Sequence, residues 1–364
     1  MSPLIKEIRH DPLLWLLALV PVVFVVQMLE PEAHTLLFVL SVGAIIPLAA
    51  LLSRATESVA ARTGDTIGGL LNATLGNLTE LVIALAALRA GQYVLVKASV
   101  AGAIVTNSLF MLGMSLLLGG LKHHVQEYNR AGTRLQAGLL FLATIAILIP
   151  SMEVETDAAP KSAQFTQTLS ICISVVLISA YGLGLLFSLR THRELFSGAD
   201  HADAGFQWPL SLALATLGGV TVMVALVSEI FVESVQQAAT ALGISPAFVG
   251  FIIVALVGGA AEMVTAFSAA RKDRLDLSVG VALGSAVQIA LFVAPVLVLV
   301  SYLIGPMPMD LQFWRGAVVM MLISTLTASL VTNSGRSAWF IGTLVVAVYL
   351  IFALTLYLLP PRVF

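Results

Sequence analysis

The sequence predicts an all-α polytopic membrane protein with about eleven transmembrane helices, on the evidence of composition, apolar blocks and an internal repeat. Of its 364 residues, 59% are hydrophobic and 10% are charged, whereas soluble domains have roughly 45–50% and about 25%. The apolar residues form continuous blocks close to the ~20 residues that a membrane-spanning helix needs. Continuous blocks also exclude a transmembrane β-barrel, whose strands alternate only weakly. A soluble enzyme and a disordered chain are therefore excluded.

The charge and cysteine counts exclude further classes. The formal net charge of −2 provides no basic surface for DNA or RNA. The single cysteine, Cys172, lies inside an apolar block, which excludes an intramolecular disulfide and a thiolate metal site. No Gly-x-x-x-x-Gly-Lys-Ser/Thr loop for nucleotide phosphates occurs. We therefore expect an ion gradient to drive the protein, with no cofactor and no enzymatic activity.

Eleven apolar blocks account for the expected spans, and the tendency of Lys and Arg to face the cytoplasm orients them. With the N-terminus in the cytoplasm and the C-terminus outside, five of the 18 Lys and Arg residues lie outside and the other 13 lie inside. This bias and the short loops favour a multi-pass protein of a prokaryotic inner (plasma) membrane. The expected spans are 13–29, 36–52, 67–88, 98–118, 135–149, 165–189, 208–232, 248–270, 277–304, 316–331 and 339–359.

An internal repeat links the two halves of the chain. Landmarks recur in the same order and at similar spacing, and each central glutamate is followed by an apolar helix. Composition alone could make one such motif match, but it does not explain the shared order. The paired landmarks are Glu57 with Glu233, Gly76 with Gly258, Glu80 with Glu262, Gly102 with Gly284, and Asn107 with Gln288.

The repeats have opposite orientation in this topology, because the Glu80 helix runs outward and the Glu262 helix runs inward. Inverted repeats that meet near the bilayer midplane are typical of alternating-access secondary transporters. The expected organisation has an N-terminal cytoplasmic segment with a peripheral first helix, a five-helix repeat, a short cytoplasmic linker and a second, inverted five-helix repeat. These parts correspond to residues 1–35, 36–190, 191–207 and 208–364.

At these positions the sequence resembles the calcium/proton exchangers of the cation/calcium exchanger superfamily. The first signature occupies residues 64–74 and 76–81, and the second occupies 260–262 and 276–295. The resemblance extends over about residues 36–355. It implies one regulatory first helix, two inverted five-helix repeats and a cation site centred on the two repeat-related glutamates.

The sequence departs from the family pattern at and beyond the expected site. Gly259 stands where the family usually has an asparagine matching Asn77, and Ala103 stands where a serine is common. We therefore expect an asymmetric pocket, with consequences for ion affinity and selectivity. The acidic linker between the halves is reduced to Glu194, Asp200 and Asp203.

Glu80 and Glu262 are the expected metal ligands and proton carriers. A charged carboxylate in a membrane-spanning helix costs about 3 kcal/mol on insertion scales, and no Lys or Arg lies in either helix core. Burial and mutual repulsion favour protonation of both groups in the empty site. Since either one Ca²⁺ or two protons neutralise the pair, competition between them would couple the two ions.

The other polar groups suit a hard cation. Ca²⁺ takes about six to eight oxygen ligands, and glycines beside the glutamates permit local unwinding that presents backbone carbonyls. The six histidines all lie in expected loops, which disfavours a soft metal. The expected supporting ligands are Asn72, Gly76, Asn77, Thr106, Asn107, Gly258, Gly259, Ser285 and Gln288.

Three further acids lie near the ends of spans. We expect Glu57, Glu229 and Glu233 to line the approach to the site, where they attract the cation or pass protons. Glu57 and Glu233 are related by the repeat, so each would serve its own face of the membrane. Ordinary interfacial anions are the alternative interpretation for each.

The sequence therefore predicts a secondary active transporter: a calcium/proton antiporter that exports Ca²⁺ from the cytoplasm in exchange for H⁺ by alternating access. Na⁺/H⁺ or Na⁺/Ca²⁺ exchange is the alternative within this class, since oxygen ligands also suit sodium. A cation channel, or an intramembrane metal-dependent enzyme with the Asp273-x-x-Asp276 motif, is the alternative from another class. The expected partners are the bilayer, calcium ions and protons, without nucleic acid, and a homo-oligomer stays open.

Overall fold

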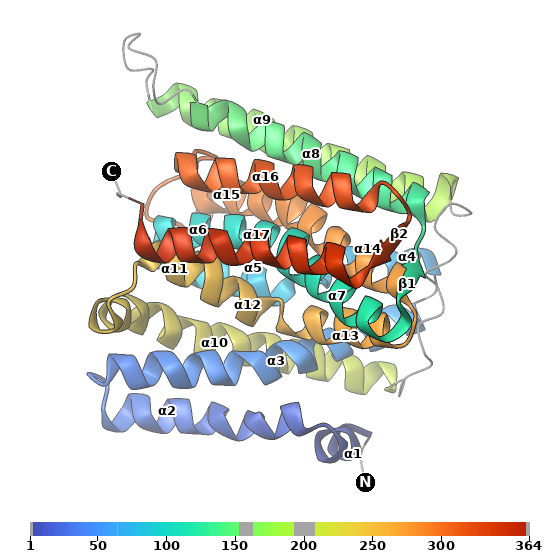
Figure 1. The fold of residues 1–364 in the computed structure, drawn as a ribbon. Coiled ribbons are helices and arrows are strands. Elements are labelled where there is room, and N and C mark those ends of the chain that lie inside the picture. The colour runs from blue at the N-terminus through green and yellow to red at the C-terminus, as the bar shows by residue number, and fades with distance from the viewer. Residues whose placement is uncertain (1–2, 64, 153–162, 193–207, 362–364) are drawn as a thin grey trace.

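The computed structural model describes residues 3–63, 65–152, 163–192 and 208–361. Within these ranges, 9 helices are long and apolar enough to cross a membrane, and the count is 11 if two bent helix pairs are each one span. Figure 1 shows the long helices side by side, so that their ends form two opposite faces of the molecule. The expected all-α membrane fold is confirmed.

The described residues of the first half of the chain form ten α-helices and strands, with tighter or wider helical turns at some ends. A 3₁₀ helix (Pro12–Ala18) precedes α2, and π-helical turns cover Thr106–Met111 and Phe187–Thr191. The elements are α1 (Pro3–His10), α2 (Leu19–Leu29), α3 (His34–Arg62), α4 (Asp65–Leu75), α5 (Leu78–Arg89), α6 (Tyr93–Val105), α7 (Leu112–His123), β1 (Val125–Glu127), α8 (Arg130–Met152) and α9 (Ala163–Leu186).

The second half follows a similar plan. It has π-helical turns at Val249–Val254 and Ile289–Val293. Its elements are α10 (Leu210–Leu242), α11 (Pro246–Phe248), α12 (Ala255–Gly258), α13 (Ala260–Arg271), α14 (Leu275–Gln288), α15 (Ala294–Ile304), α16 (Arg315–Thr332), β2 (Arg336–Ala338) and α17 (Trp339–Leu358).

Two expected spans are broken helices. The span expected at 67–88 bends by 41° between α4 and α5, and the span expected at 248–270 bends by 57° between α12 and α13. Each break falls at the small residues beside a central glutamate: Gly76 and Asn77 in the first, Gly259 in the second. Local departure from the regular helix was expected at these glycines. Within a bilayer, such breaks are tolerated where the backbone is buried in protein or lines a cavity.

The helix boundaries follow the repeat. Glu262 follows Glu80 by 182 positions (262 − 80), and the same offset relates both ends of α5, Leu78 and Arg89, to both ends of α13. In Figure 1 the chain runs from α4 to α5 in the opposite direction to its course from α12 to α13. The two broken spans are therefore antiparallel, as expected for inverted repeats. The expected linker at 191–207, with Glu194, Asp200 and Asp203, falls mostly outside the described residues.

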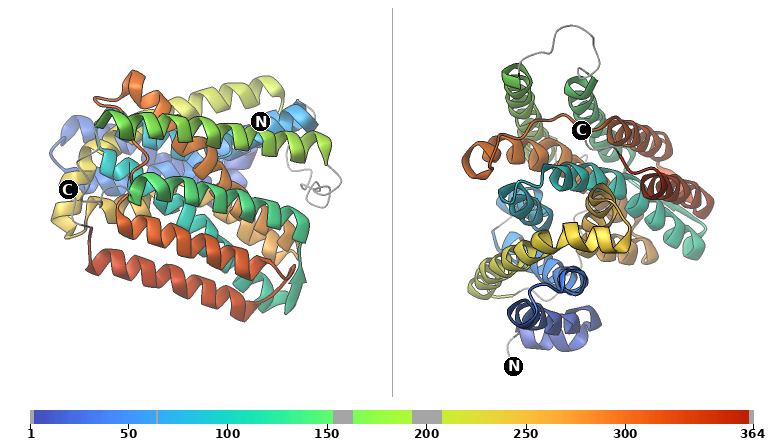
Figure 2. Two further views of the ribbon diagram at one scale, coloured as in Figure 1. Left: turned by 90° about the horizontal axis from the view of Figure 1, so that it is seen from above. Right: turned by 90° about the vertical axis from the view of Figure 1, so that its left-hand side faces the viewer.

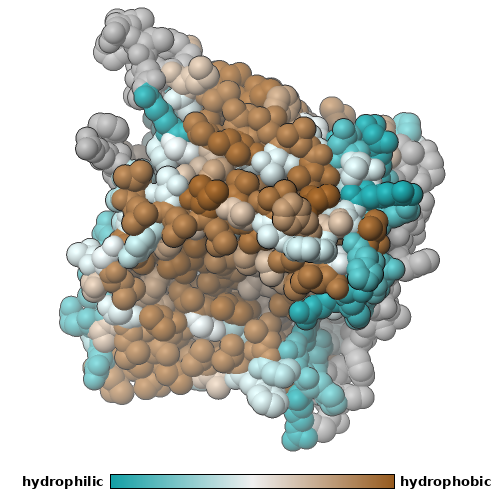
Figure 3. Space-filling model, in the orientation of Figure 1, coloured by the Kyte–Doolittle hydropathy of each residue, from teal (hydrophilic) through white to brown (hydrophobic). Residues whose placement is uncertain are grey.

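The outer surface and the two faces fit a membrane protein. A broad apolar band lies over the helices in Figure 3, and hydrophilic side chains gather toward the ends of the helices, chiefly at the right. Leu330 of α16 and Ile351 of α17 are among the exposed apolar side chains. Figure 2 shows the blue helices α2 and α3 at one edge of the bundle and the green helices α8 and α9 at the other.

We call the face that carries α1, β1 and β2 the N-terminal face, and the one opposite the C-terminal face. β1 and β2 pair antiparallel, with Val125 opposite Ala338. On the same face, the Arg54 guanidinium of α3 forms ion pairs with Glu7 and Asp11, and Glu7 accepts a 2.7 Å hydrogen bond from Trp208 Nε1. The N-terminal segment is thereby attached to α3 and to Trp208, which lies two residues before α10.

Candidate functional site

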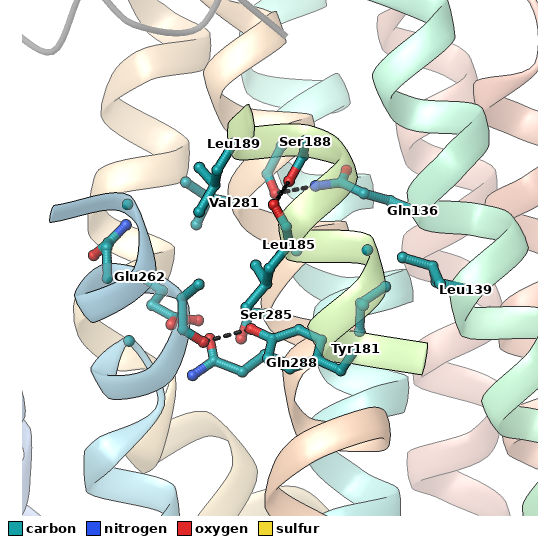
Figure 4. Close-up of a pocket in the computed structure, with 18 of the residues that line it drawn as sticks. Gln136, Leu139, Tyr181, Leu185, Ser188, Leu189, Glu262, Val281, Ser285 and Gln288 are labelled. Atoms are coloured by element: carbon teal, nitrogen blue, oxygen red, sulfur yellow. Dashed lines mark hydrogen bonds between the residues drawn. The ribbon is translucent and has the colours of Figure 1, made fainter. Parts of the chain in front are cut away.

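A cavity of about 450 Å³ leads from the N-terminal face toward the middle of the membrane. Residues on α3, α4, α8, α9, α13 and α14 line it. Figure 4 shows Ser285, Gln288 and Tyr181 close together, with Ser188 and Gln136 farther along the cavity. Ser188 follows the end of α9 at the N-terminal face, and Gln288 is the last residue of α14. The lining therefore extends from the N-terminal face to the helix breaks. The helix breaks are thus reached from one face.

The breaks place both glutamates at the starts of half-helices. Glu80 is in the first turn of α5, and Glu262 is in the first turn of α13. A helix start carries a partial positive charge from its unpaired N–H groups, which favours a carboxylate there. The preceding half-helices, α4 and α12, end beside these glutamates, and helix ends carry partial negative charge that suits a cation.

The two carboxylates come together from opposite repeats. A Cβ atom built on Gly258 would lie only 3.3 Å from Glu80 Oε1, so the Glu80 carboxylate packs directly against the break that precedes Glu262. The two carboxylates are close enough to repel each other when ionised, and the Ser285 hydroxyl interacts with Glu262. Glu262 lines the cavity, whereas Glu80 lies behind the lining, against Gly258.

A chain of hydrogen bonds joins three buried polar residues next to the glutamates. Asn107 Nδ2 donates to Ser285 Oγ at 2.7 Å, and Ser285 Oγ donates to Asn77 Oδ1 at 2.7 Å. Four buried polar atoms around this chain have no hydrogen-bond partner among the described residues: Asn77 Nδ2, Asn107 Oδ1, Glu262 Oε2 and Gln288 Nε2. Buried polar atoms are rarely left unpaired, so their clustering here indicates a binding site.

Three more of the expected ligands face the cavity. Asn72, Gly76 and Gln288 line the cavity with Glu262 and Ser285. Gly76 fits closely, since a Cβ there would lie 3.1 Å from Gln288 Oε1.

Thr106 does not face the cavity, although the sequence predicted a ligand at this position. Its hydroxyl donates instead to the Tyr349 hydroxyl of α17, at 3.3 Å. The helical turn at Thr106 points it toward α17, which spacing along the sequence does not reveal.

The three acids expected on the approach also separate. Glu57 lines the cavity, where its carboxylate accepts a 3.2 Å hydrogen bond from Ser53. Glu229 and Glu233 are exposed on the other half of α10, outside the cavity lining. Glu229 forms a 3.2 Å ion pair with Arg89 at the end of α5. An approach role for these two acids stays a prediction for a state open to the C-terminal face.

Several lining residues were not expected from the sequence. The Tyr181 hydroxyl of α9 donates a hydrogen bond to the Ala73 carbonyl in the last turn of α4. Gln136 of α8 donates to the Gly280 carbonyl at 3.3 Å. A polar side chain within an apolar span was the available signal for both, but only the packing of α8 and α9 against the repeat core gives them a place.

The described residues contain no group of three or more His, Cys, Asp or Glu side chains able to hold a metal ion. A cation here would therefore draw on the two carboxylates together with amide, hydroxyl and carbonyl oxygens. Such a donor set fits a hard cation, which takes oxygen ligands from all these groups.

Two inverted repeats that bring their carboxylates together at two broken helices define a secondary transporter. Comparison with known proteins places it more narrowly. The chain belongs to the sodium/calcium exchanger protein family, whose sequence pattern matches residues 33–190 and 212–358.

Individual relatives match most of the chain. The Ca²⁺/H⁺ antiporter of Aphanothece halophytica is 41% identical over 332 residues, covering 87% of this chain and 88% of the relative. The Ca²⁺/H⁺ antiporter ChaA of Bacillus subtilis is 40% identical, covering 89% and 92%. The solved structure of native YfkE superposes with a TM-score of 0.81 at 36% identity, covering 94% of this chain and 98% of that one.

Proposed function

We propose that this protein is a calcium/proton antiporter that exports Ca²⁺ from the cytoplasm in exchange for H⁺. The observation that carries the proposal is the pair of repeat-related carboxylates: Glu262 lines the cavity, and Glu80 lies directly behind the lining against Gly258. The relatives named as Ca²⁺/H⁺ antiporters support the same ions and do not favour the sodium alternatives.

The electrostatics of the site provide the coupling. With both carboxylates ionised and no cation, the site carries a charge of −2, which is costly to move through a low-dielectric barrier. One Ca²⁺ or two protons restores neutrality, so only these loaded forms change conformation readily. Alternation between the two forms exchanges one Ca²⁺ for two protons.

The ligands would come from both repeats. Glu262, Ser285, Gln288 and Asn72 supply oxygens in the lining, and Glu80 and Asn77 supply them from behind it. Ca²⁺ accepts such a flexible mixed set and keeps some water. Glu57, on the wall nearer the membrane surface, would attract the cation from the N-terminal face.

The charge distribution supports the direction of transport. Since Lys and Arg gather toward the cytoplasm in membrane proteins, we infer that the N-terminal face is cytoplasmic and that the membrane is a bacterial inner membrane. The cavity would then be open to the cytoplasm, which is the state that loads Ca²⁺ for export.

Reconstitution into liposomes tests the function. Purified protein in vesicles with an imposed pH gradient should drive Ca²⁺ movement against proton movement, with both fluxes followed by separate indicator dyes. Because protons compete for the same carboxylates, the Ca²⁺ concentration for half-maximal rate should rise as the pH on the loading side falls.

The alternatives predict different fluxes. A channel would pass Ca²⁺ with no pH gradient and without proton counterflow. Proton-coupled or calcium-coupled movement of Na⁺ at the Ca²⁺ rate would favour a sodium exchanger. Either result would contradict the proposal.

A further inference from the structure

The polar contacts of the two repeats are unequal, and this inequality bears on which cation the site selects, an inference that rests on the proposed function. Ser285 of the second repeat donates to Asn77 of the first at 2.7 Å. The 182-residue offset of the repeats maps Asn77 onto Gly259 and Ser285 onto Ala103. One inter-repeat contact therefore pairs two polar residues, whereas its counterpart pairs two positions that both lack a polar side chain.

The backbone conformation at position 259 does not require a glycine. Gly259 has φ −78 and ψ 5 as the residue before α13, a conformation that other L-residues adopt. Asn77, in the equivalent place before α5, has φ −98 and ψ 35 with a full side chain. The missing side chain is thus the feature that distinguishes the second break.

The space left at Gly259 has two oxygen atoms beside it. A Cβ atom placed there would lie 3.2 Å from the Ala255 carbonyl oxygen, 3.4 Å from the methyl carbon of Met263 and 3.6 Å from Asn107 Oδ1. Asn107 is 1% exposed, and its Oδ1 has no hydrogen-bond partner among the described residues. One molecule with two O–H groups can donate a hydrogen bond to each of these acceptors, and its own oxygen is then left for a cation.

We propose that Gly259 and Ala103 determine the cation selectivity of this exchanger by replacing one protein ligand with water. The water donates one hydrogen bond to Asn107 Oδ1 and one to the Ala255 carbonyl, and it coordinates the cation through its oxygen. On the other side, the Asn77 oxygen accepts from Ser285 and still has a second lone pair for the cation. At this one pair of repeat-related positions, the ion is held by the Asn77 oxygen from the first repeat and by water in place of a side chain at Gly259 in the second.

This arrangement affects the competition between Ca²⁺ and Mg²⁺. Mg²⁺ dehydrates reluctantly and usually keeps several waters, whereas Ca²⁺ accepts many protein oxygens. A site that accepts a hydrated side of the ion admits Mg²⁺ more readily than one lined by protein on both sides. Mg²⁺ should therefore compete measurably with Ca²⁺ in the natural protein.

A matched pair of variants tests the water ligand. Gly259→Ala and Gly259→Ser introduce the same Cβ, and so the same tight contact with the Ala255 carbonyl, but only serine brings an oxygen. In liposomes with an imposed pH gradient, Gly259→Ala should raise the half-maximal Ca²⁺ concentration about tenfold relative to Gly259→Ser. Equal values for the two variants would overturn the proposal.

A double variant tests the selectivity. Gly259→Asn with Ala103→Ser rebuilds the missing contact, so the ratio of the Mg²⁺ inhibition constant to the half-maximal Ca²⁺ concentration should rise about tenfold. Gly259→Asn alone, without its serine partner, should give a smaller shift, and Ala103→Ser alone should give almost none. A ratio unchanged in the double variant, or purely additive effects, would contradict the inference.

A control on the intact side keeps the test decisive if variants at 259 fail to fold. Asn77→Gly with Ser285→Ala gives the first break the residues of the second, and it should weaken Ca²⁺ about tenfold. Unchanged affinity there would show that these contacts do not determine selectivity. If the natural protein itself exchanges no Ca²⁺ for H⁺, the proposed function fails; if it does and the variants do not separate, only this inference fails.

Discussion

At the scale of single residues, the two glutamates contribute charge rather than stability. Each lies in the first turn of a half-helix, and their neighbours are amides, a hydroxyl and glycines rather than Lys or Arg. The helix starts reduce the cost of the charges. Full compensation requires a bound cation or protons, which is the physical basis of exchange.

The first prediction concerns these side chains. Glu80→Gln and Glu262→Gln should each lower Ca²⁺/H⁺ exchange at least about a hundredfold, because a neutral amide can neither release a proton nor balance the cation. Exchange is measured in liposomes under a pH gradient, and insertion is checked by yield and monodispersity of the purified protein.

Glu127→Gln is the matched control, since it makes the same change in an exposed carboxylate that pairs with Arg336. An exposed pair of this kind contributes about 0–1 kcal/mol, so exchange should stay within about threefold of the natural rate. Full pH-driven Ca²⁺ flux in either of the central variants would refute the two-carboxylate mechanism.

At the scale of elements, the tight helix packing on the C-terminal side of the site shows how the cavity on the N-terminal side can close. On the C-terminal side, α6 packs against the π-helical turn Val249–Val254 so tightly that a Cβ on Gly102 would collide with the Phe251 carbonyl oxygen. The 182-residue offset maps Gly102 onto Gly284 and Phe251 onto Gly69. Both of these counterparts line the open cavity.

The second prediction follows from this correspondence. Gly284→Ala fits the present structure, where the nearest atom to its Cβ is Gln136 Nε2 at 3.3 Å, but it should block closure of the cavity by meeting the backbone of α4. Overpacking of about 1–3 kcal/mol would lower the closed population by about fivefold to about a hundredfold. We expect exchange to fall accordingly. A cysteine at Ser188, in a Cys172→Ser background, should still react with a membrane-impermeant maleimide from the cavity side.

Gly280→Ala is the control for this prediction. Its counterpart by the same offset is Ala98, which already has a Cβ in the closed contact, 2.7 Å from the Cβ position of Gly250. Exchange by Gly280→Ala should therefore stay near the natural rate. Normal exchange by Gly284→Ala would show that the cavity closes by another movement.

At the scale of the whole molecule, the N-terminal segment is fastened to the bundle by a partly buried polar cluster. Glu7 pairs with Arg54 at 3.0 Å and accepts from Trp208 Nε1, and Trp208 is 0% exposed. A buried indole N–H that loses its acceptor costs about 1–3 kcal/mol. This cluster is therefore expected to stabilise the fold more than a surface ion pair does.

The third prediction compares the two kinds of pair. Glu7→Ala should lower the midpoint temperature of unfolding by several degrees, because it leaves the Trp208 N–H unpaired. Glu127→Ala removes a 2.7 Å pair with Arg336 whose side chains are 68% and 71% exposed, so it should change the midpoint little. Equal shifts, measured by thermal unfolding in one detergent, would contradict this account.

The fourth prediction concerns orientation in the membrane. In a Cys172→Ser background, a cysteine at Ser334 on the N-terminal face should react with an impermeant maleimide only after cells are opened. A cysteine at Met307, which is 63% exposed in the loop before α16, should react in intact cells. Labelling in the reverse order would show that the cavity faces outward and that the direction assigned to transport is wrong.

Much of the fold could be predicted because it depends on local pattern. The spans follow from runs of apolar residues, and the inverted repeat follows from landmarks such as Glu80 and Glu262 at a fixed offset. The breaks at Gly76 and Gly259 were also expected from local composition. Each of these features is determined by residues that are neighbours in the chain.

The sequence by itself thus determined the number of spans, the repeat and the two central acids. Only the tertiary structure decided that Asn107, Ser285 and Asn77 form one chain of hydrogen bonds, that Thr106 faces Tyr349, and that the cavity opens at the N-terminal face. The physical reason is that the bilayer selects apolar length segment by segment, whereas polar partners are selected by packing between helices far apart in the chain.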